Sequence, residues 1–283
     1  MQLLNSIDIA RKFVDEHKQK GLSCGLVPTM GALHQGHLSL LAKAREDNDI
    51  NICSVYVNPT QFNNTHDLEK YPRKLERDKE LLKNAGCDAL FCPADSEMYP
   101  AGREQTLQID FGQLSQVLEG KFRAGHFSGV GLVLSKLFHI IRADRAYFGQ
   151  KDLQQCGIVN KLIAELFFDI KLVVVPTVRE PNGLAMSSRN ERLSEEGRIV
   201  SAQLYVALKA VRQALEAGKS AAVARQEGLE ILGRHPEITL EYLEVVNRND
   251  FSSTSGTDIA ELAVCIAAYV DEVRLIDNVL LNS

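Results

Sequence analysis

The sequence predicts an α/β protein: an open, doubly wound parallel sheet followed by a second, smaller α+β domain. Over the first 176 residues, short and continuous apolar runs alternate with helical patterns. This alternation is typical of a parallel sheet whose two faces are both covered by helices. After Pro176 the chain changes to helices and to strands of alternating polarity, which favour an antiparallel sheet. We therefore expect two domains, residues 1–176 and 177–283.

The elements of the first domain can be assigned in order along the chain. Ser6 can cap a first helix over residues 7–20, which Gly21 would end. Apolar runs predict five strands, at residues 24–30, 51–58, 87–93, 145–152 and 169–177. Helical periodicity predicts the helices between them, at residues 36–47, 75–86, 129–142 and 153–166.

The second domain has a different pattern. Residues 195–218 and 220–235 have the composition and apolar spacing of helices. Three later segments alternate between apolar and polar residues and are predicted to be strands, at residues 239–247, 262–270 and 271–281. Helices beside antiparallel strands make this the smaller α+β domain.

Composition excludes several classes of function. The net charge of −5 argues against bulk attraction to nucleic acid or to an anionic membrane, because both bind cationic surfaces. No stretch approaches the roughly 20 apolar residues of a membrane span. The six cysteines form no CxxC pair and several lie in strand-like runs, so we expect them to be buried and reduced. These features predict a cytoplasmic protein.

The chemically interesting stretches all follow predicted strands. "PTMGALHQGH", "NPTQF", "FGQKD" and "PTVREPNGLAMSSRN" leave the first, second, fourth and fifth strands of the first domain. Because ligands of open α/β sheets bind beyond the carboxyl ends of the strands, we expect these loops to build one site.

Two histidines in the first loop, His34 and His37, allow three interpretations. They could bind a metal, although the Glu of H-E-x-x-H and a third ligand at a known spacing are lacking. They could be structural residues at a helix start. They could also donate hydrogen bonds to phosphate, which free N–H groups and the positive end of a helix dipole favour. The last interpretation is strengthened by the cations and hydroxyls of Lys151, Ser187, Ser188 and Arg189.

Six ordered motifs resemble a known family. "PTMGALHQGH", "YVNPTQF", "YPRKLERD", "FRAGHFSGV", "FGQKDLQQ" and "PTVREPNGLAMSSRN" are similar to the pantothenate synthetases (pantoate–β-alanine ligases) of the HxGH nucleotidyltransferase superfamily. The resemblance implies a Rossmann-like fold, a homodimer and a need for ATP and Mg²⁺. It also implies that (R)-pantoate and β-alanine are condensed to pantothenate through a pantoyl-adenylate, with release of AMP and pyrophosphate.

The resemblance also implies site residues. His37, as proton donor, His34 and Lys151 would be catalytic, and Asp78 would bind Mg²⁺. Gln61 and Gln155 would bind pantoate, with Gln61 also near β-alanine. The second domain would close over ATP. The implied ATP contacts are Met30, Gly31, Ala32, Leu33, His34, Gln35, Gly36, His37, Gly149, Gln150, Lys151, Asp152, Val178, Met186, Ser187, Ser188 and Arg189.

Two other functions are compatible with the motifs. Another HxGH nucleotidyltransferase would stop at the nucleotidyl product, and a nucleotide-sensing module would bind ATP without releasing pyrophosphate. A tRNA-charging enzyme is disfavoured, because 283 residues leave little room for an anticodon-binding domain and the net charge is negative.

Overall fold

The computed structural model describes residues 1–63, 65–103, 106–253 and 258–281. The chain forms two compact units, which we call the first and the second unit. The first unit comprises residues 1–149 and 158–175, and the second unit comprises residues 150–157 and 176–283. Residues 150–157, assigned to the first domain from the sequence, therefore group with the C-terminal part of the chain.

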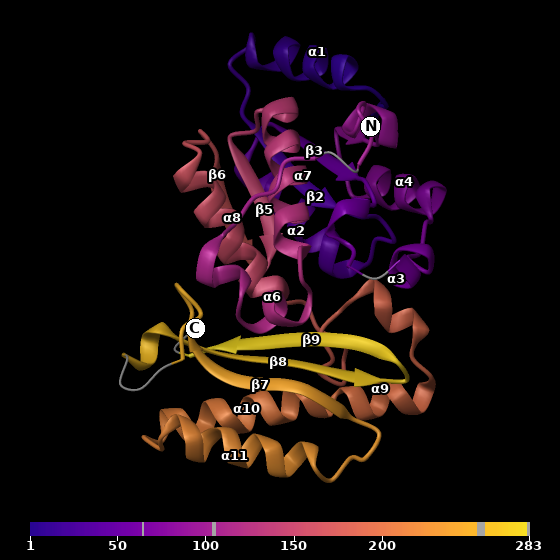
Figure 1. Ribbon diagram of the computed structural model, residues 1–283. Coiled ribbons are helices and arrows are strands. Elements are labelled where there is room, and N and C mark those ends of the chain that lie inside the picture. The colour runs from indigo at the N-terminus through magenta and orange to yellow at the C-terminus, as the bar shows by residue number, and fades with distance from the viewer. Residues whose placement is uncertain (64, 104–105, 254–257, 282–283) are drawn as a thin grey trace. The chain divides into compact units, whose positions relative to one another are not determined.

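The first unit is built on a parallel sheet. Its described strands are β1 (Gln2–Leu4), β2 (Cys24–Thr29), β3 (Ile50–Val55), β4 (Ala89–Phe91), β5 (Arg145–Gly149) and β6 (Lys171–Val175). They lie in the order β1-β4-β3-β2-β5-β6, and every neighbouring pair is parallel. Figure 1 labels β2, β3, β5 and β6 of this sheet. The alternation of apolar runs and helices thus predicted five of these six strands.

Helices precede, connect and follow these strands. They are α1 (Ile7–Lys18), α2 (Gln35–Asp47), α3 (Thr65–Glu69), α4 (Leu75–Asn84), α5 (Asp95–Met98), α6 (Leu118–Phe122), α7 (His126–Ile141) and α8 (Leu153–Glu165). Shorter 3₁₀ segments of the chain are η1 (Pro59–Gln61), η2 (Gly112–Ser115), η3 (Gln150–Asp152), η4 (Ser188–Arg192) and η5 (Ile259–Glu261).

The two faces of the sheet are covered by different helices. Leu41 of α2 and Leu82 of α4 share a core cluster with Val27 and Cys53 of the strands. α1 and α7 contact each other and belong to connections that run in the opposite direction across the sheet. Right-handed crossovers place such connections on the opposite face. The sheet is therefore doubly wound.

The direction of winding changes at β2. From β2 the chain proceeds through β3 to β4, whereas β5 and β6 lie on the other side of β2. Leu26 of β2 pairs with Ala146 of β5. In open α/β sheets, ligands bind beyond the carboxyl ends of the strands at such a switch point. Residues 30–37 leave the sheet there, and β5 ends at the same edge.

Two details of the first unit differ from prediction. β1 was not predicted, because a three-residue strand with two exposed residues has no detectable periodicity; it pairs with the end of the sheet at β4. α7 begins at His126, three residues before the predicted start, directly after Gly125 with a φ of +77°. Glycine adopts this left-handed conformation without steric cost, so the helix can start there.

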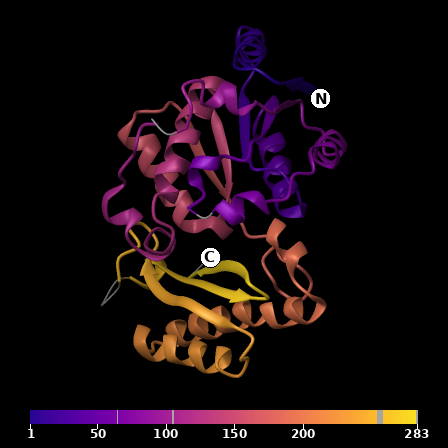
Figure 2. The same ribbon diagram turned by 45° about the vertical axis from the view of Figure 1, so that its right-hand side comes forward.

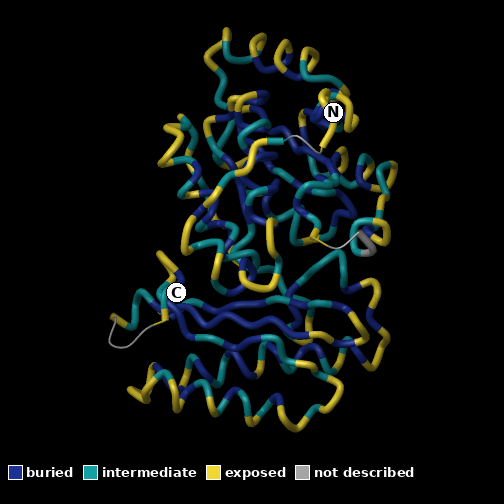
Figure 3. Tube along the Cα trace, viewed as in Figure 1, coloured by how far each residue is buried: buried dark blue, intermediate teal, exposed yellow. Residues whose placement is uncertain are grey.

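The described part of the second unit contains an antiparallel sheet and two long helices. Its strands are β7 (Thr239–Asn247), β8 (Leu262–Val270) and β9 (Val273–Leu280), in the order β7-β8-β9. Its helices are α9 (Glu195–Ser201), α10 (Gln203–Glu216) and α11 (Ala221–Leu232). α10 and α11 pack on one face of the sheet (Figure 2). Figure 3 shows buried residues along the strands and exposed ones along the outer sides of these helices. The predicted fold class is therefore confirmed.

The single helix predicted over residues 195–218 is wrong. The chain forms a turn at Ala202, which separates α9 from α10. Tertiary contacts account for the difference, because Ser194 before α9 donates its backbone N–H to Asp271 at 2.9 Å, whereas α10 packs along β8 and β9. The strand predicted from residue 271 begins at Val273. Asp271 and Glu272 have φ of +50° and +61° and form the hairpin turn before it.

Candidate active site

The two histidines of the first loop stand at the start of α2. His34 is the N-cap residue, and its Nδ1 accepts a hydrogen bond from the backbone N–H of Gly36 at 3.1 Å. The Nδ1 of His37 accepts from the backbone N–H of His34 at 3.3 Å. The ring centroids are 4.1 Å apart. Both rings therefore cap the helix and lie together, as their spacing predicts.

These capping contacts indicate where each imidazole carries its proton. A ring nitrogen that accepts an N–H has no proton of its own, so the neutral form of each ring is protonated at Nε2. This assignment comes from the hydrogen bonds rather than from hydrogen positions. The Nε2 of His34 and the Nε2 of His37 are thus hydrogen-bond donors, the property that phosphate binding requires.

The backbone of the same loop wraps around the carboxylate of Asp78. Gly31 and Ala32 have φ of +82° and +49°, which turns successive N–H groups toward one point. Asp78, 1% exposed, accepts from Ala32 N at 2.9 Å and from Leu33 N at 2.8 Å. The N–H groups of Ala32 and Leu33, two of the implied ATP contacts, are therefore already bonded within the protein.

Gln61 ends η1 and is 7% exposed. Its Oε1 accepts a hydrogen bond from Nδ2 of Asn58 at 3.1 Å, and its Nε2 lies 3.1 Å from Sδ of Met30. A thioether sulfur is a weak acceptor. The amide nitrogen of Gln61 is therefore the end of the side chain that would gain most from a stronger acceptor such as a substrate oxygen.

The amide of Asn58 is held in one orientation. Its Nδ2 also donates to the carbonyl oxygen of Gly129 at 3.1 Å, and a carbonyl can only accept, so the nitrogen must face it. Its Oδ1 accepts from the hydroxyls of Tyr99 at 2.6 Å and Thr60 at 3.0 Å. A Cβ at Gly129 would lie 2.3 Å from the Thr60 carbonyl oxygen, so only glycine permits this approach of α7 to η1.

Tyr99 is itself fixed by Lys136 of α7. The Lys136 ammonium lies 3.8 Å from the centroid of the Tyr99 ring and donates to the carbonyl oxygen of Met98. Burial lowers the pKa of Lys136 and raises the pKa of Tyr99. A chain of contacts thus runs from Lys136 of α7 to Tyr99 by a cation–π contact, and from Tyr99 through Asn58 to Gln61 by hydrogen bonds.

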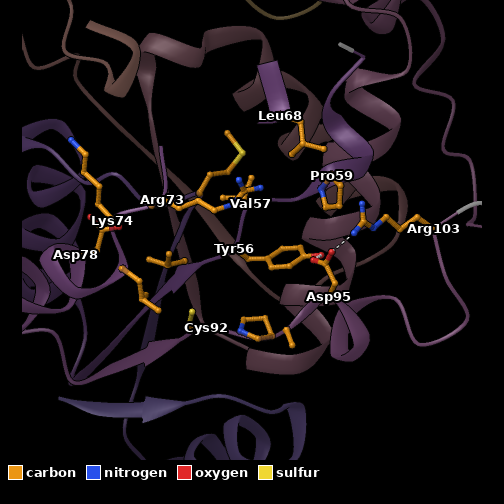
Figure 4. A pocket seen from close by; sticks show the side chains of 16 residues that line it. Tyr56, Val57, Pro59, Leu68, Arg73, Lys74, Asp78, Cys92, Asp95 and Arg103 are labelled. Carbon is orange, nitrogen blue, oxygen red and sulfur yellow. Dashed lines mark hydrogen bonds and ion pairs between the residues drawn. The ribbon is translucent and has the colours of Figure 1, made fainter. Parts of the chain in front are cut away.

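A pocket of about 360 Å³ opens beyond the carboxyl ends of β2, β3 and β4 (Figure 4). Asp95 lies between Arg103, which pairs with it, and Tyr56, whose hydroxyl donates to it at 2.9 Å. The pocket combines cations, carboxylates and apolar groups from the loops that follow three neighbouring strands. Its lining residues are Met30, Gly31, Val55, Tyr56, Val57, Pro59, Leu68, Arg73, Lys74, Leu75, Asp78, Cys92, Pro93, Ala94, Asp95 and Arg103.

In the second unit, the loop that contains Lys151 is bonded to β9. Asn278, 2% exposed, donates through Nδ2 to the carbonyl oxygens of Gln150 and Lys151, both at 2.9 Å. Its Oδ1 accepts from Nε2 of Gln150 at 3.2 Å. The Lys151 side chain is 17% exposed, and its Nζ lies 3.7 Å from Oδ1 of Asp152.

The serine-rich loop also belongs to the second unit. Ser187 caps η4, its hydroxyl accepting from the backbone N–H of Arg189 at 3.2 Å. Met186 donates its N–H to the carbonyl oxygen of Val178 at 3.0 Å. Buried Asn190 donates through Nδ2 to Glu180 at 2.9 Å and so ties the end of the loop to its beginning. The implied ATP contacts from Val178 to Arg189 therefore form one hairpin-like segment.

The predicted site residues are thus distributed over both units. The first unit brings together Met30 and Gln61, and it places Asp78 against the histidine loop. The second unit holds Lys151 and, at the third position of α8, the half-buried Gln155.

Sequence reasoning missed the supporting residues Asn58, Tyr99 and Asn278. Asn58 stands in the quoted motif "YVNPTQF" and could have been singled out there, whereas Tyr99 and Asn278 have no local signal.

No group of three or more His, Cys, Asp or Glu side chains suited to a metal occurs among the residues that the structure describes. The carboxylate oxygens of Asp78 each accept a backbone N–H. Its assignment as an Mg²⁺ ligand stays a prediction. No helix in the described part of the chain is long and apolar enough to cross a bilayer.

Comparison with known proteins decides the family. Residues 2–280 match the family of pantoate-beta-alanine ligases. The chain belongs to this family. Pantothenate synthetase of Cytophaga hutchinsonii is 47% identical over 280 residues, which cover 98% of each chain. Pantothenate synthetase of Moorella thermoacetica is 45% identical over 283 residues, which cover 100% of this chain and 99% of the relative.

Solved structures of pantoate–β-alanine ligases have the same fold. A crystal structure of the Thermus thermophilus enzyme is 42% identical, with a TM-score of 0.93 over 99% of both chains. The Francisella tularensis enzyme, described as complexed with beta-gamma ATP and β-alanine, is 33% identical, with a TM-score of 0.82 over 99% of this chain and 97% of that one. The family resemblance and the assignment as a ligase are therefore confirmed along the whole chain.

Proposed function

We propose that this ligase joins (R)-pantoate to β-alanine in two steps. The pantoate carboxylate attacks the α-phosphorus of ATP, the bond to pyrophosphate breaks, and pantoyl-adenylate forms. The amine of β-alanine then attacks the acyl carbon, loses a proton, and AMP leaves as the acyl–oxygen bond breaks. The observation that carries this proposal is the family match over residues 2–280, supported by the Francisella relative described with ATP and β-alanine.

The adenylation step needs donors for phosphate oxygens rather than a protein nucleophile, because the substrate carboxylate is the nucleophile. His34 and His37 can supply Nε2–H donors from the start of α2, and Lys151 supplies a cation. Ser187, Ser188 and Arg189 would bind further phosphate oxygens. The ATP contacts implied by the motifs keep these roles in the proposal.

Pantoate would be held by the two neutral amides. Gln61 offers its Nε2 to a pantoate oxygen in exchange for the weak contact with Met30. Gln155 would bind pantoate from the first turn of α8. An amide can both donate and accept, which suits the pantoate hydroxyls, whereas an acidic side chain would repel the pantoate carboxylate.

Mg²⁺ would enter with the phosphates of ATP. Magnesium at ATP sites is commonly held by one or two carboxylates together with substrate phosphates and water. Asp78 is the implied ligand, and Asp152 offers a half-exposed carboxylate beside Lys151. The ion would neutralise charge on the phosphate oxygens.

A homodimer, a cytoplasmic location and closure of the C-terminal domain over ATP remain predictions.

One experiment tests the two-step scheme. Labelled pyrophosphate should exchange into ATP in the presence of pantoate and Mg²⁺ without β-alanine, and AMP should appear in equal amount to pantothenate when β-alanine is added. Exchange that requires β-alanine would contradict a pantoyl-adenylate. An end product that retains the nucleotidyl group would favour the alternative nucleotidyltransferase, and ATP binding without pyrophosphate release would favour a sensing module.

A further inference from the structure

The C-terminal strand β9 is bonded directly to the chain around Lys151. Asn278 lies 127 residues from Lys151 in sequence, yet its Nδ2 bridges the carbonyl oxygens of Gln150 and Lys151 at 2.9 Å each. Its Oδ1 accepts from Nε2 of Gln150 at 3.2 Å. The nitrogen and the oxygen of the buried Asn278 amide therefore both form hydrogen bonds with two consecutive residues of the loop.

Asn278 has a rigid support of its own. It pairs with Cys265 of the central strand β8. Beside it, the buried carboxylate of Asp277 accepts from Nη2 of Arg179 at 3.0 Å and also from Nη1. The Arg179 guanidinium lies 3.6 Å from the centroid of the Tyr205 ring. An ion pair and a stacked ring thus hold the end of β9 in place.

Lysine needs such support if its ammonium is to act at a defined position. Its side chain has a flexible four-carbon stem and a single point charge, so the main chain at Lys151 must be fixed before the charge can be aimed. Displacing a reacting group by about 1 Å can cost ~10²-fold in rate. The two bonds from Asn278 restrain the carbonyl groups on either side of the Lys151 Cα.

We propose that Asn278 is a positioning residue for the adenylation step, which acts by fixing the main chain of Gln150 and Lys151. This inference rests on the proposed role of Lys151. Through Asn278, β9 orients the Lys151 ammonium that binds the phosphates of ATP. The C-terminal sheet thereby supports the reaction. Gln150 takes part as well, because its amide completes the set of bonds that Asn278 makes.

A double-mutant cycle tests this inference in the full chain. We expect Asn278→Ala to lower kcat for pyrophosphate exchange by ~10-fold or more, with the KM for ATP changed by less than ~3-fold. In the Lys151→Ala background, Asn278→Ala should lower kcat by less than ~2-fold, because the effect of Asn278 passes through Lys151. Asn278→Asp is a second variant of nearly equal volume, and it should also lower kcat because it loses both donated bonds.

The matched control is Asn247→Ala on β7, whose amide donates to Glu261 at 3.3 Å rather than to the loop. It should leave kcat unchanged. If the losses of kcat in Asn278→Ala and Lys151→Ala multiplied in the double mutant, the two residues would act independently and the positioning role would be overturned. A wild-type kcat in both Asn278 variants would overturn it as well. Wild-type exchange in Lys151→Ala alone would instead overturn the proposed role of Lys151. Thermal unfolding of each variant identifies any loss of kcat caused by poor folding.

Discussion

The backbone N–H of Leu33 donates a hydrogen bond to the carboxylate of Asp78 at 2.8 Å, and the neighbouring N–H of Ala32 donates to the same carboxylate at 2.9 Å. A residue of α4, 45 positions further along the chain, thus sets the shape of the histidine loop. Asp78 is also the implied Mg²⁺ ligand. Because the two roles have different consequences when the side chain is changed, they can be separated by experiment.

Asp78→Asn should destabilise the protein and reduce activity at every Mg²⁺ concentration. An amide nitrogen would face one backbone N–H, and an unpaired buried donor costs about 1–3 kcal/mol. Thermal unfolding without Mg²⁺ should therefore show a lower Tm. Glu76→Gln, at an exposed position of α4, serves as the control. An unchanged Tm with a raised Mg²⁺ requirement would instead support direct ligation by Asp78.

Tyr99→Phe should weaken pantoate binding while leaving ATP binding nearly intact. The substitution removes the hydroxyl that donates to Asn58 at 2.6 Å and keeps the ring beneath Lys136. A lost hydrogen bond of about 0.5–1.5 kcal/mol corresponds to a rise of roughly 2-fold to 13-fold in the KM for pantoate. Tyr147→Phe removes a comparable hydroxyl, which bonds Asn48 at 2.7 Å, away from the residues that line the pocket, and is the matched control. A selective effect on Gln61 would be contradicted if Tyr99→Phe changed the KM for ATP as much as the KM for pantoate. It would also be contradicted if the control variant raised the KM for pantoate equally.

His37→Gln should retain a higher rate of pyrophosphate exchange than His37→Asn. The Nδ1 of His37 caps α2, so the reaction would use Nε2–H, and the longer amide of glutamine reaches closer to that position. His37→Ala should slow pyrophosphate exchange by ~10²-fold or more. In His37→Ala the lost bond to the backbone N–H of His34 should also cost about 0.5–2 kcal/mol of stability, whereas glutamine at this third helical position can still accept that N–H. A near-wild-type rate in folded His37→Ala would leave His37 with a structural role alone.

Gln155→Ala should weaken pantoate binding by ~3-fold to 100-fold, with little change in ATP binding, because a lost amide contact and any unpaired substrate group both cost free energy. Gln155→Glu should be worse than Ala, since a second carboxylate would face that of pantoate. Calorimetric titration of each variant with each ligand measures both affinities. Loss of ATP binding alone would place Gln155 outside the acid site.

Cys92 should react with iodoacetamide faster than Cys24 or Cys87 in the native protein. Burial raises the pKa of Cys24 to about 12 and that of Cys87 to about 11, so little reactive thiolate exists at neutral pH. Burial also raises the pKa of Cys92, but this thiol is only half-buried and lines the pocket of the first unit, so the reagent can reach it. Its labelling should accelerate as pH rises, because the thiolate is the nucleophile, and Cys92→Ser should remove the fast phase seen by mass spectrometry. Faster labelling of Cys24 or Cys87 would contradict this order.

The sequence by itself determined five of the six described strands of the parallel sheet, the longer helices around them and the loops that carry the motifs. These features follow from local periodicity, because a buried parallel strand and an amphipathic helix each leave a pattern within a few consecutive residues. His34 and His37 were found at a helix start for the same reason: their spacing and the glycine between them are local. The ordered motifs were enough to indicate the family.

Only the tertiary structure decided which side chains hold these loops in shape. Asp78 against Ala32, Tyr99 against Asn58, and Asn278 against Lys151 join residues that lie 46, 41 and 127 positions apart. No pattern of neighbouring residues records such a pairing, because it depends on strand order and on the close approach of helices. The turn at Ala202 has the same origin, since helix propensity favours continuity there and the packing of α9 and α10 overrides it.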